Sequence, residues 1–176
     1  MKTMAILFAL GTGLFAQDPV YERFFTDYYF HYAPTQGTSA GFHQYDNQLE
    51  DYSRKAVDAQ IRDARRLEAV FAKLPPSDDR DLVLGRLRSD LLSLQNIRMW
   101  EKNPDTYSSG VTGSVFSIMS RKFAPEPDRL KSVIAREKQI PAVLADGRTN
   151  LKNPPRIYTE VALEQIPGII RFFQKD

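Results

Sequence analysis

Apolar residues recur every three or four positions along two long stretches that meet at Leu74-Pro75-Pro76-Ser77. This period matches the 3.6 residues of an α-helical turn, so each stretch predicts an amphipathic helix with a charged outer face. The apolar positions are Val57, Ile61, Ala64, Leu67, Phe71 and Leu74 in the first stretch, and Leu84, Leu87, Leu91, Leu94 and Ile97 in the second. The pattern predicts a helical hairpin over residues 53–100.

The turn of this hairpin is marked by two adjacent prolines, which a helix interior does not tolerate. Ser77 is placed to cap the second helix, and the acidic residues that follow it favour a helix N-terminus. Because the connection is short, the two helices are expected to be antiparallel neighbours.

Further helices are predicted on both sides of the hairpin. Their ranges are Pro19–Tyr32, 106–121, 128–140, 142–150 and the segment from Tyr158 onward, in which Pro167-Gly168 predicts a kink. No run of alternating apolar and polar residues marks a strand. The sequence therefore predicts an all-α fold, a multi-helix array built around the antiparallel hairpin.

The first 16 residues differ from the rest of the chain. Lys2 precedes an apolar run that ends at the small residue Ala16. One positive charge followed by a short apolar run is typical of a secretory signal peptide, and the run is shorter than the roughly 18 apolar residues of a membrane-spanning helix. An N-terminal core helix is the alternative. We expect a signal peptide over residues 1–16, a helical domain over 17–176, a periplasmic or secreted location and no transmembrane span.

Composition narrows the chemistry that the chain can carry. The 176 residues are 42% hydrophobic and 26% charged, as in ordinary globular proteins. The 24 basic and 22 acidic residues are spread along the chain, so no concentrated basic face for nucleic acid is expected. There is no cysteine, so we expect no disulfide, thiolate zinc site, cysteine nucleophile or cysteine-linked lipid anchor.

The densest group of unusual polar residues lies just before the hairpin, at His43, Tyr45 and Asp46. His43 and Asp46 together can orient a substrate group or supply hydrogen bonds behind one. In the alternative interpretation, Asp46 caps backbone amides and His43 packs locally. His43, Tyr45 and Asp46 are the candidate substrate-cleft residues.

No self-sufficient active site is predicted. A His-Glu-x-x-His zinc site needs two histidines four residues apart, whereas His31 and His43 are twelve apart. The sequence has no Gly-x-x-x-x-Gly-Lys loop for phosphate and no Gly-x-Ser-x-Gly elbow for a nucleophile. We assign no catalytic residue, no metal ligand and no cofactor to this chain.

From Pro34 onward, the order of turn and loop residues resembles a bacterial family called domain of unknown function 885 (DUF885). The matching residues are Pro34, Thr38, Gly41, His43, Tyr45-Asp46, Leu49, Asp51-Tyr52-Ser53, Asn103-Pro104, Tyr107, Phe123-Ala124-Pro125, Arg129, Ile140-Pro141, Leu144, Asn150-Leu151-Lys152-Asn153-Pro154-Pro155, Thr159, Ala162, Gln165 and Gly168. They extend over nearly all of the chain after the predicted signal peptide.

This resemblance implies a helical, exported, zinc-metallopeptidase-like protein. The family's His-Glu-x-x-His motif lies in a C-terminal portion that has no counterpart here, so zinc is implied for full-length relatives only. The chain is then expected to be an N-terminal helical segment, not catalytic by itself. Its implied partners are the missing C-terminal portion and, in full-length relatives, a peptide-like substrate. The alternative is a stand-alone helical protein-interaction module.

Overall fold

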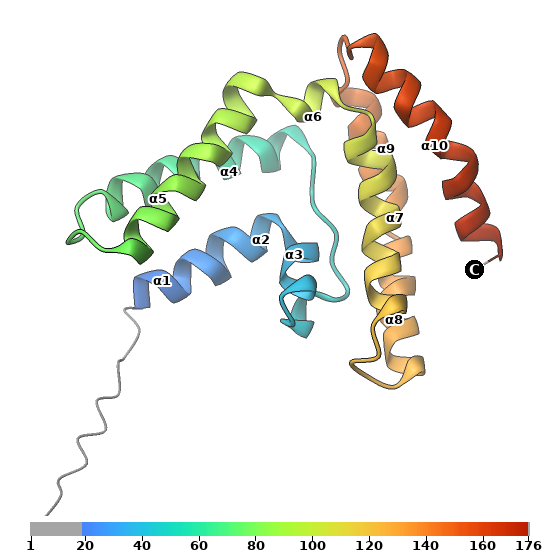
Figure 1. Cartoon of the computed structure of the whole chain (residues 1–176), viewed down its shortest axis with the longest axis horizontal. Helices are drawn as coiled ribbons and strands as arrows, with labels where there is room; N and C mark the ends of the chain where they lie inside the picture. The colour runs from blue at the N-terminus through green and yellow to red at the C-terminus, as the bar shows by residue number, and fades with distance from the viewer. Residues whose placement is uncertain (1–18, 176) are drawn as a thin grey trace, which may run out of the picture.

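Helices account for all the regular secondary structure of the computed structural model, which describes residues 19–175 (Figure 1). No strand occurs in this range, and the predicted all-α fold is confirmed. The predicted signal peptide over residues 1–16 lies outside the described residues. The helices form an arch: the hairpin and the first helical segment make one arm, and α7, α8, α9 and α10 make the other (Figure 1).

The first helical segment is continuous but widened in its middle. It consists of α1 (Pro19–Arg23), the π-helical turn η1 (Phe24–Tyr29) and α2 (Phe30–Tyr32). After it come α3 (Pro34–Ser39) and the 3-10 turn η2 (His43–Tyr45), where the sequence predicted a bent connection. Phe24 and Tyr28 of this segment are buried against the apolar face of the hairpin.

The hairpin forms as predicted, from α4 (Arg54–Phe71) and α5 (Asp78–Leu91), which lie side by side (Figure 1). Both helices begin with a serine cap: Ser53 Oγ accepts from Ala56 N at 3.2 Å, and Ser77 Oγ accepts from Arg80 N at 3.2 Å. The apolar faces meet those of the first segment in one cluster, made of Phe24, Tyr28, Ala64, Leu67, Phe71, Val83, Leu84 and Leu87.

The second arm of the hairpin does not run to Trp100 as one α-helix. It passes into a π-helical turn, η3 (Leu92–Ile97), and stops at Arg98, whose φ of 57° is left-handed. The Arg98 amide donates to Ser93 O at 2.7 Å, the five-residue spacing of a π-helical turn. The short helix α6 (Met99–Lys102) then starts in a new direction.

The other arm is built on α7 (Asp105–Ser120), against which α8 (Glu126–Glu137), α9 (Ile140–Asn150) and α10 (Arg156–Lys175) all pack. Two further apolar clusters fill it, Leu49 with Tyr107, Val111 and Val143, and Val115 with Ile118 and Val133. Pro141 lies at the start of α9, where a missing amide costs nothing. α10 continues as one helix through Pro167.

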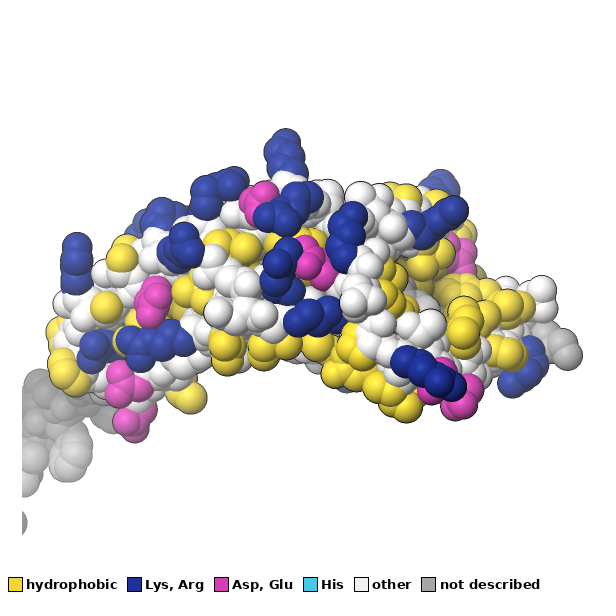
Figure 2. Space-filling view, turned by 90° about the horizontal axis from the view of Figure 1, so that it is seen from above, with side chains coloured by type: hydrophobic (Ala, Val, Ile, Leu, Met, Phe, Trp, Pro, Cys, Tyr) yellow, Lys and Arg dark blue, Asp and Glu magenta, His cyan; other side chains and the backbone are white. Residues whose placement is uncertain are grey.

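Charged side chains cover the surface of the hairpin, and several of them form ion pairs. Figure 2 shows dark-blue Lys and Arg side chains along one face, with acidic side chains among them. Arg88 meets Glu68 at 2.9 Å and Arg86 meets Asp90 at 2.9 Å. In the part of the chain that the structure describes, no helix has both the length and the apolar content to cross a membrane.

Candidate functional site

His43 and Asp46 form a pair within one turn of chain. His43 Nδ1 lies 3.0 Å from Asp46 Oδ2, and the imidazole stacks on the ring of Phe123, with 4.0 Å between ring centroids and 16° between planes. The His43 side chain is 45% exposed, whereas that of Asp46 is 8% exposed. Of these two residues, His43 is the one that faces solvent.

Tyr45, the third candidate, packs inside the loop. Its ring lies against the backbone of Gly37, where a Cβ atom would come within 2.6 Å of Tyr45 Cδ2. The same ring lies 5.6 Å from that of Phe30. Tyr45 therefore holds α3 and η2 together, and the missing side chain of Gly37 makes room for it.

The segment that carries these candidates is fastened to the other arm by Arg136, a residue that sequence reasoning did not select. Arg136 is completely buried in α8. Its Nη1 donates to Ser114 O at 2.6 Å, and its Nη2 donates to Thr38 Oγ1 at 2.7 Å and to Tyr45 O at 3.4 Å. The sequence does contain an indication that Arg136 is buried. Arg129, Val133 and Arg136 share the inward face of α8, so an arginine occupies a position where an apolar residue is expected.

Charge also acts in the contact between Arg136 and the loop, which we call the Arg136 joint. Burial lowers the pKa of Arg136, and the nearby carboxylates of Glu50 and Asp46 oppose that shift. Asp46 Oδ1 and Arg136 Nε are both buried without a hydrogen-bond partner. The charge of Asp46 thus acts on Arg136 through space, and this part of the cluster has a structural role.

The side-chain amides of Gln139 and Asn150 also bind the loop that carries the candidate residues. Gln139 Nε2 donates to Asn47 O at 2.8 Å, and Gln139 Oε1 accepts from Leu49 N at 3.2 Å. Asn150 Nδ2 donates to Tyr52 O at 2.7 Å. The loop is therefore held at the end of α8, at the junction between α8 and α9, and at the end of α9.

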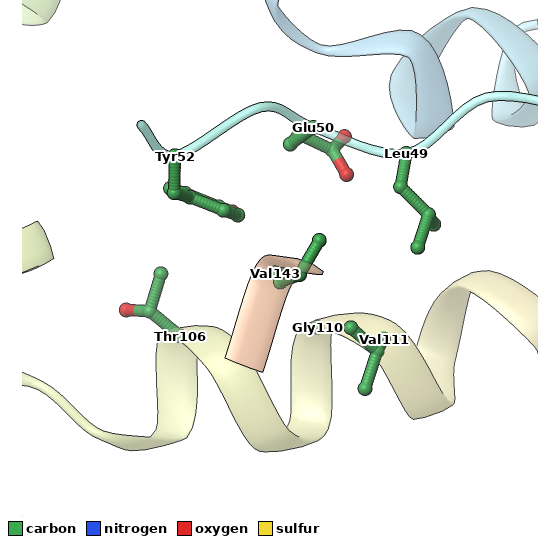
Figure 3. A pocket seen from close by; sticks show the side chains of 7 residues that line it. All are labelled: Leu49, Glu50, Tyr52, Thr106, Gly110, Val111 and Val143. Atoms are coloured by element: carbon green, nitrogen blue, oxygen red, sulfur yellow. The ribbon is translucent and has the colours of Figure 1, made fainter. Parts of the chain in front are cut away.

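An enclosed pocket lies beneath this loop (Figure 3). Its lining comes from three parts of the chain: Leu49, Glu50 and Tyr52 from the loop, Thr106, Gly110 and Val111 from α7, and Val143 from α9. The cavity measures about 10 Å³, whereas one water molecule needs about 10–15 Å³ by the same measure. The pocket is too small for a substrate.

A larger, open groove runs between α7 and α10. It holds about 460 Å³, which is within the roughly 300–1,000 Å³ of ligand sites. Its lining includes Ser109, Thr112 and Phe116 on one side and Glu164, Gln165 and Arg171 on the other. Ser109 Oγ donates to Gln165 Oε1 at 2.9 Å and so ties the two helices together. The lining combines hydroxyl groups, the Glu164 carboxylate and the Arg171 guanidinium with the apolar ring of Phe116.

The residues present do not fit zinc, the metal implied by the resemblance. Between residues 19 and 175, no group of three or more His, Asp or Glu side chains is placed to hold a metal ion. The His43 nitrogen nearest to a carboxylate is taken up by Asp46.

The fold of this chain is similar to part of a larger protein of known structure. It is similar to a solved structure from Shewanella oneidensis, described as a candidate lipoprotein of unknown function, with 27% sequence identity and a TM-score of 0.80. The match covers 89% of this chain but 30% of that one. The matched part of this chain therefore spans less than a third of the length of this relative.

No curated protein is detectably similar to the chain. The sequence model of the family described as bacterial protein of unknown function (DUF885) matches residues 34–176, from the start of α3 to the last residue. The resemblance seen in the loop residues is thereby confirmed over four-fifths of the sequence, and the chain belongs to the DUF885 family.

Proposed function

We propose that this chain is the N-terminal, non-catalytic helical portion of an exported DUF885 protein whose zinc-peptidase-like chemistry resides elsewhere in the longer polypeptide. The observation that carries the proposal is the coverage of the Shewanella structure. Nearly the whole of this chain, 89%, matches a fold that makes up 30% of that protein. This coverage supports a role as one structural part of a larger helical protein.

The geometry of the described residues agrees with this role. The enclosed pocket has room for about one water molecule, and the open groove has no histidine base. The buried polar groups hold helices together, as the bonds of Arg136 to Ser114 and Thr38 do. The description of the Shewanella relative as a candidate lipoprotein supports export.

Within this role, His43 is the residue placed to meet a substrate. Its ring is held by Asp46 on one edge and Phe123 on one face, and it remains 45% exposed. A held, exposed imidazole is suited to orienting a peptide-like substrate. Tyr45 and Asp46 would act behind it by fixing the loop.

Peptide hydrolysis tests the proposal directly. The purified chain and the intact Shewanella protein are assayed with a mixed peptide library and added zinc, each against a chelator-treated sample and a mock preparation. We expect hydrolysis by the intact protein and none by this chain. Zinc-dependent hydrolysis by this chain, abolished in His43→Gln, would overturn its non-catalytic role.

A second candidate function is a stand-alone helical interaction module, which the exposed apolar residues of α10 favour. Hydrogen exchange at residues 169–173 discriminates between the two. A module is expected to protect these amides strongly in a verified monomer, whereas a segment of a larger structure is expected to exchange there rapidly.

A further inference from the structure

α10 presents large apolar side chains on two different faces. One face is packed: Ala162 is buried, Gln165 is bonded to Ser109, and Phe172 lies against the cluster around Ile118. A second row follows the helix at spacings of three, four and three residues, and it comprises Leu163, Ile166, Ile170 and Phe173. We call this row the outer stripe of α10.

The outer stripe is open to solvent along its whole length. Its four side chains are between 38% and 59% exposed. Among the described residues, α7 is the one element against which α10 packs extensively. In Figure 2, yellow side chains gather at the right-hand end of the molecule, where α10 lies.

The spacing of the outer stripe identifies the kind of surface that fits it. Apolar residues at alternating intervals of three and four form the seam of one helix packed along another. A second exposed apolar row beside the packed face of a helix is typical of an interaction site. The expected occupant is therefore an amphipathic helix with a complementary apolar row.

Two observations indicate where that helix comes from. The DUF885 sequence model includes the whole of α10, so the helix is part of the structure that the family shares. The Shewanella relative devotes 30% of its chain to the matched fold, which leaves 100 − 30 = 70% with no counterpart here. A helix in the same polypeptide reaches the stripe at a high effective concentration, which a separate protein does not.

We infer that the outer stripe of α10 is the docking surface for an amphipathic helix from the remaining portion of the longer DUF885 protein. This inference rests on the proposed function, which it deepens by naming the surface at which the two portions join.

The absence of cysteine from the sequence makes thiol labelling a clean test. Four single-cysteine variants are made: Leu163→Cys and Ile170→Cys on the stripe, Glu160→Cys on the exposed polar side, and Ala162→Cys on the packed face. The labelling rate with a maleimide is measured for each in the native chain, over a range of protein concentrations. The same positions, located by superposition, are then measured in the intact Shewanella protein in a cysteine-free background.

In the chain alone, we expect the two stripe thiols to react as fast as Glu160→Cys, with Ala162→Cys slow. In the intact protein, the stripe positions should react roughly tenfold or more slowly, because labelling then requires local opening, while the Glu160 position stays fast. If the stripe positions react as fast as the Glu160 position in the intact protein, the inference is overturned. So would slowing in the chain alone as its concentration rises, which would identify a second copy as the occupant.

A failure of this inference can be distinguished from a failure of the proposed function. Hydrolysis by the isolated chain would refute its non-catalytic role and leave the labelling rates interpretable. Conversely, an open stripe in the intact protein would refute the docking surface without making the isolated chain catalytic.

Discussion

Gly147 in α9 lies directly against the ring of Tyr107 in α7, so closely that a Cβ atom on Gly147 would come within 2.7 Å of Tyr107 Cγ. The ring has little freedom to move away. Its hydroxyl donates to Trp100 O at 2.5 Å and accepts from Asn150 Nδ2 at 3.2 Å. α7 and α9 can therefore approach this closely because Gly147 has no side chain.

Gly147→Ala is expected to lower the free energy of unfolding by about 1–3 kcal/mol, the usual cost of overpacking a core. The helical preference of alanine, worth about 1 kcal/mol, offsets part of that cost. Urea unfolding followed by circular dichroism measures the change. Gly85→Ala in α5 is the matched control, since no atom lies within 4 Å of its Cβ position. It should gain about 0.5–1 kcal/mol, and a similar gain at Gly147 would refute the steric argument.

Arg136→Met is expected to cost about 2–5 kcal/mol, because it leaves buried acceptors and the Asp46 carboxylate without their cationic partner. Arg156→Met provides the comparison, since the Arg156 side chain is 91% exposed and pairs with Glu160 on the surface. That change should stay within about 0.5 kcal/mol. The midpoint of urea unfolding reports both. Equal midpoints for the two variants would show that the joint contributes nothing to stability.

Ionisation of the Tyr28 phenol is expected to lower the free energy of unfolding at high pH. Burial raises its pKa, and so does Asp90, whose Oδ2 accepts from the hydroxyl at 2.9 Å. In the unfolded chain the phenol ionises near pH 10, while the folded protein keeps its proton. The folded state then binds more protons, so its contribution to stability is full below about pH 10 and is lost as pH rises further.

Tyr28→Phe should therefore flatten the loss of stability between about pH 9 and pH 11, at a cost of about 1 kcal/mol at neutral pH for the lost hydrogen bond. Thermal unfolding at several alkaline pH values checks this. An unchanged slope would mean that Tyr28 ionises as easily in the folded protein as in the unfolded chain.

Asp146 produces a pH dependence at the acidic end. Burial, followed by the charge of Asp51, raises its pKa. A carboxyl group with a raised pKa in the folded state stabilises the fold while protonated, and that contribution is lost as pH rises through the folded-state value. Asp146→Asn should raise the unfolding temperature at pH 7 and leave it nearly unchanged at pH 3. Asp128→Asn, at an exposed surface pair with Lys131, is the control; an equal response from both would count against the burial of Asp146.

The features that sequence predicted correctly are those that neighbouring residues determine. The hairpin follows from helical periodicity, and Ser77 caps the second helix by accepting from the amide three residues further on. The pairing of His43 with Asp46 is likewise local. Whether these residues line a substrate cleft stays a prediction.

The features that sequence missed depend on distant contacts or on backbone geometry. Arg136 meets Thr38 across 98 residues, and nothing near Arg136 indicates which acceptor it will find. The left-handed Arg98 was missed because arginine rarely adopts a positive φ. The second arm of the hairpin was consequently predicted to run too far.

The three separate apolar clusters of this small protein have a thermodynamic consequence. Because each is small, the molecule is expected to open in parts, so that hydrogen exchange would resolve units of different stability. Phe172 of α10 belongs to the cluster around Val115 and Ile118. A helix bound to α10 would therefore suppress opening of that unit first. The hairpin would respond to the extent that the bonds between the two arms, among them those of Arg136 and Asn150, transmit the order across the arch.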